Sequence, residues 1–137
     1  MSDQPGQTPA ATWDEPELRS LVTLAESTAR AAGSLVEQGR RAAPVTVAAT
    51  KSSPTDVVTA MDRAAEQLIT DLVHQARPDD ALFGEEAGGV AGRPGRSSGL
   101  TWVIDPIDGT VNYLYGLPAY AVSVAVVTGD PRRPGGW

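Results

Sequence analysis

Two pairs of carboxylates are the residues of this 137-residue sequence best suited to chemistry. Asp105 and Asp108 flank Pro106 directly after an apolar run, and Glu85 and Glu86 stand together earlier in the chain. Two unit charges ~4 Å apart repel by roughly 4 kcal/mol at an effective dielectric constant of 20. A hard divalent cation removes that repulsion, and a ligand set made only of oxygen favours Mg²⁺, Mn²⁺ or Ca²⁺ over zinc. The carboxylates therefore predict a metal site.

The residues around the second pair predict an anion site beside the metal. Pro106 biases Asp105 toward an extended backbone, so Asp105 is expected at a strand end, with Ile107 and Asp108 in a turn. Such a turn can aim both carboxylates and the Ile107 carbonyl at one point. A helix opening at Gly109–Thr110 would present free N–H groups to an anion. A metal beside an anion suits hydrolysis of a phosphate ester, in which the metal activates water.

Each motif also has a purely structural interpretation when it is taken alone. An Asp-Pro-x-Asp segment is usually a turn with an aspartate cap, and a Glu-Glu pair is usually solvated. The order of the two motifs and the attached Gly109–Thr110 pair make the combination far more specific than either part. We therefore favour the metal and phosphate site.

The composition narrows the class of protein. A hydrophobic fraction of 41% and a charged fraction of 20% fit one globular domain. The net charge of −6 and the single lysine, Lys51, argue against nucleic acid, whose binding needs clustered positive charge. The chain has no cysteine, which excludes disulfides and thiolate metal sites. No signal peptide or apolar run of ~20 residues is evident, so we expect a cytoplasmic protein that does not enter a membrane.

Helical periodicity predicts two long helices. Asp14 and Glu17 form a capping-box pattern, and apolar residues then recur at helical spacing until Gly39, which is the expected stop. A second helix is expected from residue 59 or 62 to residue 76, ended by Pro78. The apolar faces of these two helices would pack against the sheet.

Short apolar runs predict the strands, and polar or Pro/Gly-rich stretches predict the rest. Strands are expected over residues 45–49, 81–83, 100–104 and 119–127, with a loop over 51–54 and a mobile flap over 87–99. Residues 1–13 are expected to form a disordered tail, and residues 131–137 a Pro/Gly tail. One metal-binding unit over residues 14–130 remains between them.

Three blocks of this chain resemble the inositol monophosphatase family of Mg²⁺-dependent, often lithium-sensitive phosphatases. They are residues 51–62 (KSSPTDVVTAMD), residues 84–86 (GEE) and residues 102–115 (WVIDPIDGTVNYLY), and the likeness spans about residues 18–127. The resemblance implies an α/β (α+β layered) fold. It would be the N-terminal half of a sugar-phosphatase-like αβαβα sandwich, with two long helices packed on a mostly antiparallel sheet.

The resemblance also implies metal ligands. Glu85 would bind the first metal and orient the attacking water, with Glu86 as a supporting carboxylate. Asp105 would bridge two metals, Ile107 would lend its carbonyl, and Asp108 would bind the second metal. The implied metal is Mg²⁺, with Mn²⁺ as a possible substitute.

The remaining implied roles concern phosphate and water. Gly109 and Thr110 would hold the phosphate through their backbone N–H groups. Thr110 and Asp62 would share activation of the water, which makes Glu85, Asp62 and Thr110 the catalytic set. Lys51 would lie in a mobile loop that closes near the metals. The structural alternatives are a helix cap for Asp62 or Thr110 and simple solvation for Lys51.

The chain departs from the family in length more than in its motifs. Met61 and Val111 replace residues that are commonly Thr, and neither change removes a ligand. The family's second half, with a W-D-x-A-A-G-type block whose Asp completes the second metal site, has no counterpart in this sequence. We therefore expect two-metal catalysis by this chain alone to be impaired. A truncated gene model, a frameshift, a split protein and a genuine non-catalytic fragment would each give such a chain.

The expected function is Mg²⁺-dependent hydrolysis of a phosphate monoester, with inositol monophosphate as the first candidate substrate. Fructose bisphosphate, histidinol phosphate and a nucleotide 3′-phosphate are the alternatives within the family. A non-catalytic metal-binding or interaction fragment, pairing with itself as a homodimer or with a separate C-terminal half, is the alternative from another class. An acidic fragment with no metal function is the third.

Overall fold

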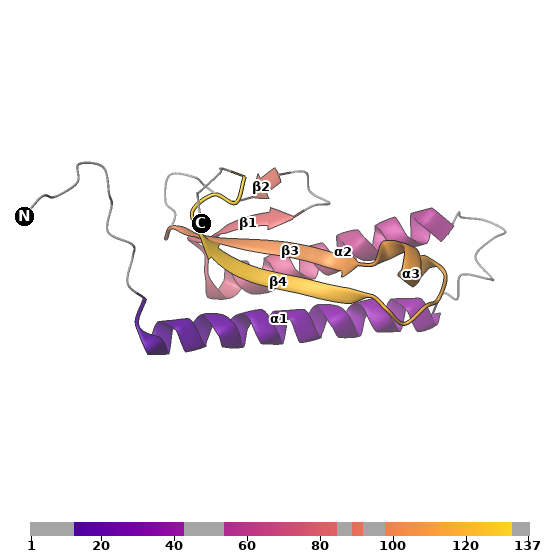
Figure 1. Cartoon of the computed structure of the whole chain (residues 1–137), viewed down its shortest axis with the longest axis horizontal. Helices are drawn as coiled ribbons and strands as arrows, with labels where there is room; N and C mark the ends of the chain where they lie inside the picture. Colours follow the sequence, from indigo (N-terminus) through magenta and orange to yellow (C-terminus); the bar gives the residue numbers. More distant parts are fainter. Residues whose placement is uncertain (1–12, 43–53, 85–88, 92–97, 133–137) are drawn as a thin grey trace, which may run out of the picture.

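A computed structural model of the chain describes residues 13–42, 54–84, 89–91 and 98–132, and it has two long helices on one face of a four-stranded sheet (Figure 1). Helix α1 spans Glu15–Ala42 and helix α2 spans Pro54–Ala76. Both helices contribute buried side chains to one apolar cluster with Leu100, Trp102 and Ile104 of the sheet. Because alternate residues of a strand share a face, this cluster places both helices on the same side of the sheet. The expected layered fold is confirmed.

The sheet has the strand order β2-β1-β3-β4. Its strands are β1 (Ala81–Gly84), β2 (Gly89–Ala91), β3 (Leu100–Asp108) and β4 (Ala121–Thr128). β1 runs parallel to β3, whereas β1–β2 and β3–β4 are antiparallel, as expected for a mostly antiparallel sheet. The flap expected over residues 87–99 is wrong in part, because β2 lies inside it and pairs with β1. The strand expected over residues 45–49 lies outside the described residues.

The first helix begins as its capping box predicts and ends later than expected. The Asp14 backbone N–H donates to Glu17 Oε2 at 3.1 Å, and the Glu17 N–H donates to Asp14 Oδ1 at 2.9 Å. Gly39 does not stop the helix, which continues to Ala42. A β carbon at Gly39 would collide with the Met61 side chain of α2. This glycine therefore serves the close packing of the two helices.

The second helix begins earlier than residue 59, because Pro54 is its first residue rather than part of a loop. Proline is well suited to that position, since the first N–H of a helix has no intrahelical acceptor and its φ is already helical. The helix ends at Ala76 as predicted. Within the described ranges, none of the helices is both long enough and apolar enough to cross a membrane.

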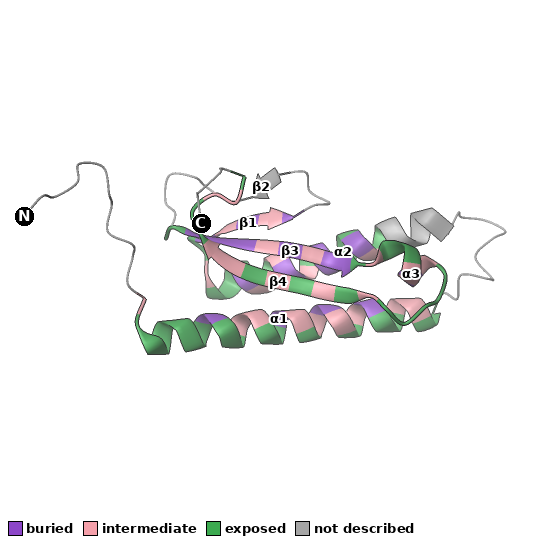
Figure 2. Ribbon diagram, in the orientation of Figure 1, coloured by how far each residue is buried: buried purple, intermediate pink, exposed green. Residues whose placement is uncertain are grey.

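The core lies between the helices and the inner face of the sheet, where the buried residues of β3, α1 and α2 meet (Figure 2). Trp102 is its largest fully buried side chain. A second cluster forms near the carboxyl end of β3, where Ile107 and Tyr113 pack against Val36 and Ala65. The second cluster supports the segment that carries the Asp105 and Asp108 motif.

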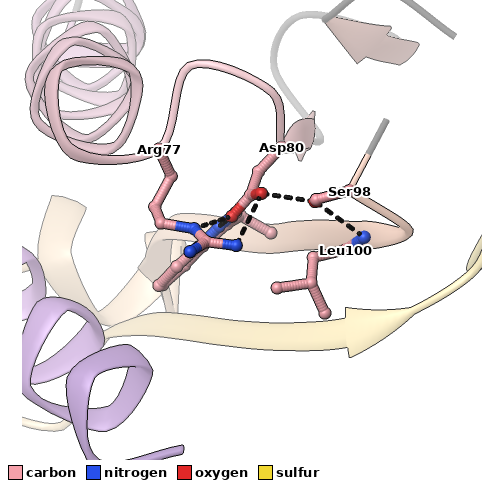
Figure 3. A network of polar contacts seen from close by, with 5 residues as sticks. Arg77, Asp80, Ser98 and Leu100 are labelled. Carbon is pink, nitrogen blue, oxygen red and sulfur yellow. Dashed lines mark hydrogen bonds and ion pairs between the residues drawn. The ribbon is translucent and has the colours of Figure 1, made fainter. Parts of the chain in front are cut away.

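A buried aspartate joins the amino ends of the two parallel strands (Figure 3). Asp80 accepts hydrogen bonds from Arg77 Nε at 2.8 Å, from Ser98 Oγ at 2.5 Å and from the Trp102 indole N–H at 2.8 Å. Ser98 Oγ accepts the Leu100 N–H at 3.2 Å. Asp80 directly precedes β1, and Leu100 begins β3. This network therefore holds β1 and β3 in the register that pairs Gly84 with Ile104.

Burial and hydrogen bonding act on the Asp80 carboxylate in opposite directions. Burial disfavours its charged form, but the hydrogen bonds from Arg77, Ser98 and Trp102 outweigh that effect. The pKa of Asp80 is therefore lowered from its ordinary value of 3.8. Asp80 is ionised near neutral pH and contributes to stability in that form.

Candidate functional site

The two aspartates of the motif lie on a bulged strand rather than on a strand followed by a turn. Asp105 pairs with Ser123 and Asp108 pairs with Ala121, so three steps along β3 oppose two steps along β4. The bulge contains Pro106, which has no N–H to give to the ladder. The turn expected at Ile107 and Asp108 is therefore wrong, because both residues belong to β3, which ends at Asp108.

The bulge decides where the two carboxylates point. In a regular strand, residues three apart face opposite sides of the sheet. Here Asp105 and Asp108 pair with residues two apart on β4, which share one face. The bulge therefore brings the two aspartates onto the same face, away from the helices. Asp105 is half-buried and Asp108 is exposed.

The Ile107 carbonyl already contacts another site residue. The Thr110 hydroxyl donates a hydrogen bond to this carbonyl oxygen at 3.1 Å. A carbonyl oxygen has two lone pairs, so the hydrogen bond from Thr110 does not by itself prevent it from coordinating a cation. The donor set that β3 offers is thus two carboxylates and a carbonyl, which fits a hard divalent ion.

Gly109 connects β3 to the short helix α3, which spans Thr110–Leu114. Its φ of 87° lies in the left-handed region. A β carbon at Gly109 would lie 2.8 Å from the Ala119 carbonyl oxygen. Both backbone conformation and space therefore require glycine at this position.

Replacing Gly109 with alanine is expected to lower the free energy of unfolding by at least about 2 kcal/mol, because it adds left-handed strain to a backbone collision. Urea denaturation measures the loss. Gly116→Ala is the matched control, since Gly116 has a φ of 75° and a β carbon there would lie 3.5 Å from Arg40 Nη2, an ordinary contact. Equal losses in the two variants would show that the contact with Ala119 is unimportant.

Tyr113 fixes α3 to the helical layer. Its hydroxyl donates to the Val36 carbonyl oxygen at 3.1 Å, and its ring packs edge-on against Tyr120 with centroids 5.0 Å apart. Burial raises the pKa of Tyr113, the Tyr120 and Asp62 charges add to the rise, and Arg40 opposes it. Ala65, three residues after Asp62 on α2, belongs to the same buried cluster as Tyr113, so this part of α2 lies beside α3.

Asp62 cannot be a helix cap. It lies well inside α2, which begins at Pro54, and it is only 5% exposed. Glu66 follows one turn later on the same helix and is 8% exposed. The sequence interpretation missed Glu66, although its spacing of four from Asp62 puts both residues on one helix face. α2 thus carries two buried carboxylates.

Three of the expected site residues, Lys51, Glu85 and Glu86, lie outside the described residues. Across the described ranges, no group of three or more His, Cys, Asp or Glu side chains is arranged to hold a metal. The structure brings Asp105 and Asp108 to one face and leaves Asp62 in the helical layer near α3. Gly84, which precedes Glu85 in the sequence, pairs with Ile104, which precedes Asp105.

The fold and these motifs define a class of phosphatase-related proteins. The sequence model of the inositol monophosphatase family matches residues 17–132, so the chain belongs to that family. It is 54% identical over 80 residues to inositol-1-monophosphatase SuhB of Mycobacterium tuberculosis, covering 58% of this chain and 28% of that protein. It is 36% identical over 109 residues to the Nus factor SuhB of Escherichia coli, covering 80% of this chain and 39% of that protein.

Solved structures agree with this assignment. The structure of Mycobacterium tuberculosis SuhB matches with a TM-score of 0.61 and 40% identity, over 81% of this chain and 36% of that one. SaIMPase-II bound to inositol monophosphate matches with a TM-score of 0.60 and 27% identity, over 81% of this chain and 37% of that one. The same protein has also been solved with 2′AMP. The chain therefore spans less than two fifths of the length of these relatives.

Proposed function

We propose that this chain is the metal-binding part of a Mg²⁺-dependent phosphate monoesterase whose substrate is an inositol monophosphate. The observation that carries the proposal is the β3 bulge, which turns Asp105 and Asp108 to one face. Two carboxylates on the same face of the bulge repel each other, and a divalent cation relieves that repulsion. Membership of the inositol monophosphatase family supports the same reaction.

The proposed cation ligands come from the ends of two neighbouring parallel strands. Asp105, the Ile107 carbonyl and Asp108 belong to β3, and Glu85 follows β1 in the sequence. Glu86 would support Glu85 as a neighbouring carboxylate. When bound, Mg²⁺ would activate a water and neutralise charge on the phosphate, with Mn²⁺ as a substitute. We propose lithium sensitivity as a property of the same site.

The proposed work of the other residues is to hold the phosphate and to move a proton. The Gly109 and Thr110 N–H groups would bind phosphate oxygens, and Lys51 would approach from its loop. Asp62 would accept a proton relayed through the Thr110 hydroxyl from the attacking water. In the structure that hydroxyl donates to Ile107, so the relay requires it to rotate toward Asp62.

Inositol monophosphate is preferred among phosphate esters because a relative of 27% identity has been solved with this compound bound. The same relative has also been solved with 2′AMP bound, which makes a nucleotide phosphate a second candidate. The substrate test should therefore compare myo-inositol 1-phosphate with fructose 1,6-bisphosphate, histidinol phosphate and a nucleotide 3′-phosphate.

Phosphate release from myo-inositol 1-phosphate tests the proposed function. The expected result is release that depends on Mg²⁺ and is greatly increased when a polypeptide covering the rest of the family fold is added. The added polypeptide tests whether a separate C-terminal half completes the site. Analytical ultracentrifugation of the chain alone tests whether it forms a homodimer. The proposal would be refuted if calorimetry detected no Mn²⁺ binding by the chain and if no phosphate were released, either by the chain alone or after the polypeptide is added.

A further inference from the structure

Glu66 is a buried carboxylate that the proposed mechanism does not yet use. It lies on α2, one turn after Asp62, and only 8% of it is exposed. Removing a carboxylate from water is unfavourable unless specific contacts compensate. A carboxyl group kept in such a position is therefore a candidate for a functional role.

The Glu66 carboxylate packs against the last residue of β1. A β carbon at Gly84 would lie 2.6 Å from Glu66 Oε1, 2.8 Å from its Cδ and 3.1 Å from its Oε2. Both carboxylate oxygens thus occupy the space that any other residue at position 84 would fill. Glycine inside a strand commonly marks such a close approach. The contact joins α2 directly to the carboxyl end of β1.

That end of β1 is also the end at which β3 carries its aspartates. Gly84 pairs with Ile104, and Asp105 comes next on β3. Glu85 comes next in the sequence after Gly84. A small shift of the backbone at Gly84 would therefore be passed to Ile104 and to the start of the Asp105 motif.

We propose that Glu66 is a positioning residue for the cation site, because its carboxylate fixes the backbone at Gly84. The inference rests on the proposed function, since it assumes that a divalent cation binds where β1 and β3 end. Residues that orient metal ligands without touching the metal typically change metal affinity 10- to 100-fold when they are replaced. Glu66 would act on the cation site through Gly84 and the pairing of Gly84 with Ile104, which directly precedes Asp105.

Calorimetric titration of the full chain with Mn²⁺ tests this role. Glu66→Gln keeps the size of the side chain and is expected to weaken Mn²⁺ binding by about 10-fold. Asp71→Asn is the matched control, because Asp71 is an exposed carboxylate on the same helix and its replacement changes the net charge equally. The control is expected to bind Mn²⁺ as the unmodified chain does.

A second variant and a second readout separate positioning from general stability. Gly84→Ala leaves the Glu66 side chain in the sequence but displaces its carboxylate, and it is also expected to weaken Mn²⁺ binding. Unfolding midpoints measured without metal show whether each variant is folded at the titration temperature. If Glu66→Gln does not fold, the comparison of Gly84→Ala with the unmodified chain decides the question.

The possible outcomes distinguish this inference from the proposed function. If the unmodified chain binds Mn²⁺ and Asp105→Asn weakens binding, but folded Glu66→Gln and Gly84→Ala bind normally, the role of Glu66 is overturned and the cation site stands. If the unmodified chain does not bind Mn²⁺, the proposed function fails and the inference fails with it.

Discussion

Replacing Asp80 with asparagine is expected to lower the free energy of unfolding by about 2–4 kcal/mol at pH 7. The Asp80 side chain is 1% exposed, and its two oxygens accept from Arg77, Ser98 and the Trp102 indole. An asparagine amide has one acceptor oxygen, so its NH₂ group would face a donor at the other position. Arg77 is 32% exposed, which lets water compensate part of the loss. Urea denaturation of the two proteins measures the difference.

The pH dependence of stability provides a second readout of the same variant. Because the pKa of folded Asp80 is lowered from 3.8, its contribution is present above that pH and is lost as the pH falls through the folded value. Asp80→Asn should lack this part of the acid destabilisation. Asp79→Asn is the control, since Asp79 is exposed and adjacent in sequence, and we expect it to change stability by less than about 0.5 kcal/mol. Similar losses in both variants would contradict the role given to the buried network.

Replacing Asp105 with asparagine is expected to weaken Mg²⁺ or Mn²⁺ binding by at least about 100-fold. Residues that only orient ligands already change affinity by roughly 10- to 100-fold, and Asp105 is proposed to touch two ions. Glu86→Gln is expected to have a smaller effect, of about 10-fold, because Glu86 is proposed to support Glu85 rather than to bind the metal. Calorimetric titration of the three proteins with Mn²⁺ measures these affinities.

Unfolding measurements without metal accompany the Asp105 comparison, because a misfolded variant would also lose affinity. The affinities are compared at a temperature at which all three proteins are folded. Equal losses of affinity in Asp105→Asn and Glu86→Gln would contradict the different roles assigned to the two residues.

Much of the local structure could be predicted from the sequence. The Asp14 and Glu17 capping box forms as its residue types require, because both partners lie within one helical turn. Helical periodicity identified α1 and α2, and apolar runs identified β1, β3 and β4. The family could also be identified from the sequence, because its motifs and their order depend only on residue types and spacing.

Other features could not be predicted because they depend on residues far apart in the sequence. Gly39 has the residue type of a helix stop, yet it lies inside α1 where Met61 of α2 packs against it. Asp80 has no local signal of importance, and its partners Ser98 and Trp102 lie on another segment. Glu66 gained significance only when the fold placed it against Gly84.

For the candidate site, the sequence by itself determined which groups are available: two carboxylates, a carbonyl and a Gly-Thr pair in one short segment. The tertiary structure decided how they point. Spacing along the chain puts Asp105 and Asp108 on opposite faces of a regular strand, and only pairing with β4 shows the bulge that turns them to one face. Pairing between strands is a long-range interaction, so the direction of these side chains follows from the folded sheet and not from the motif alone.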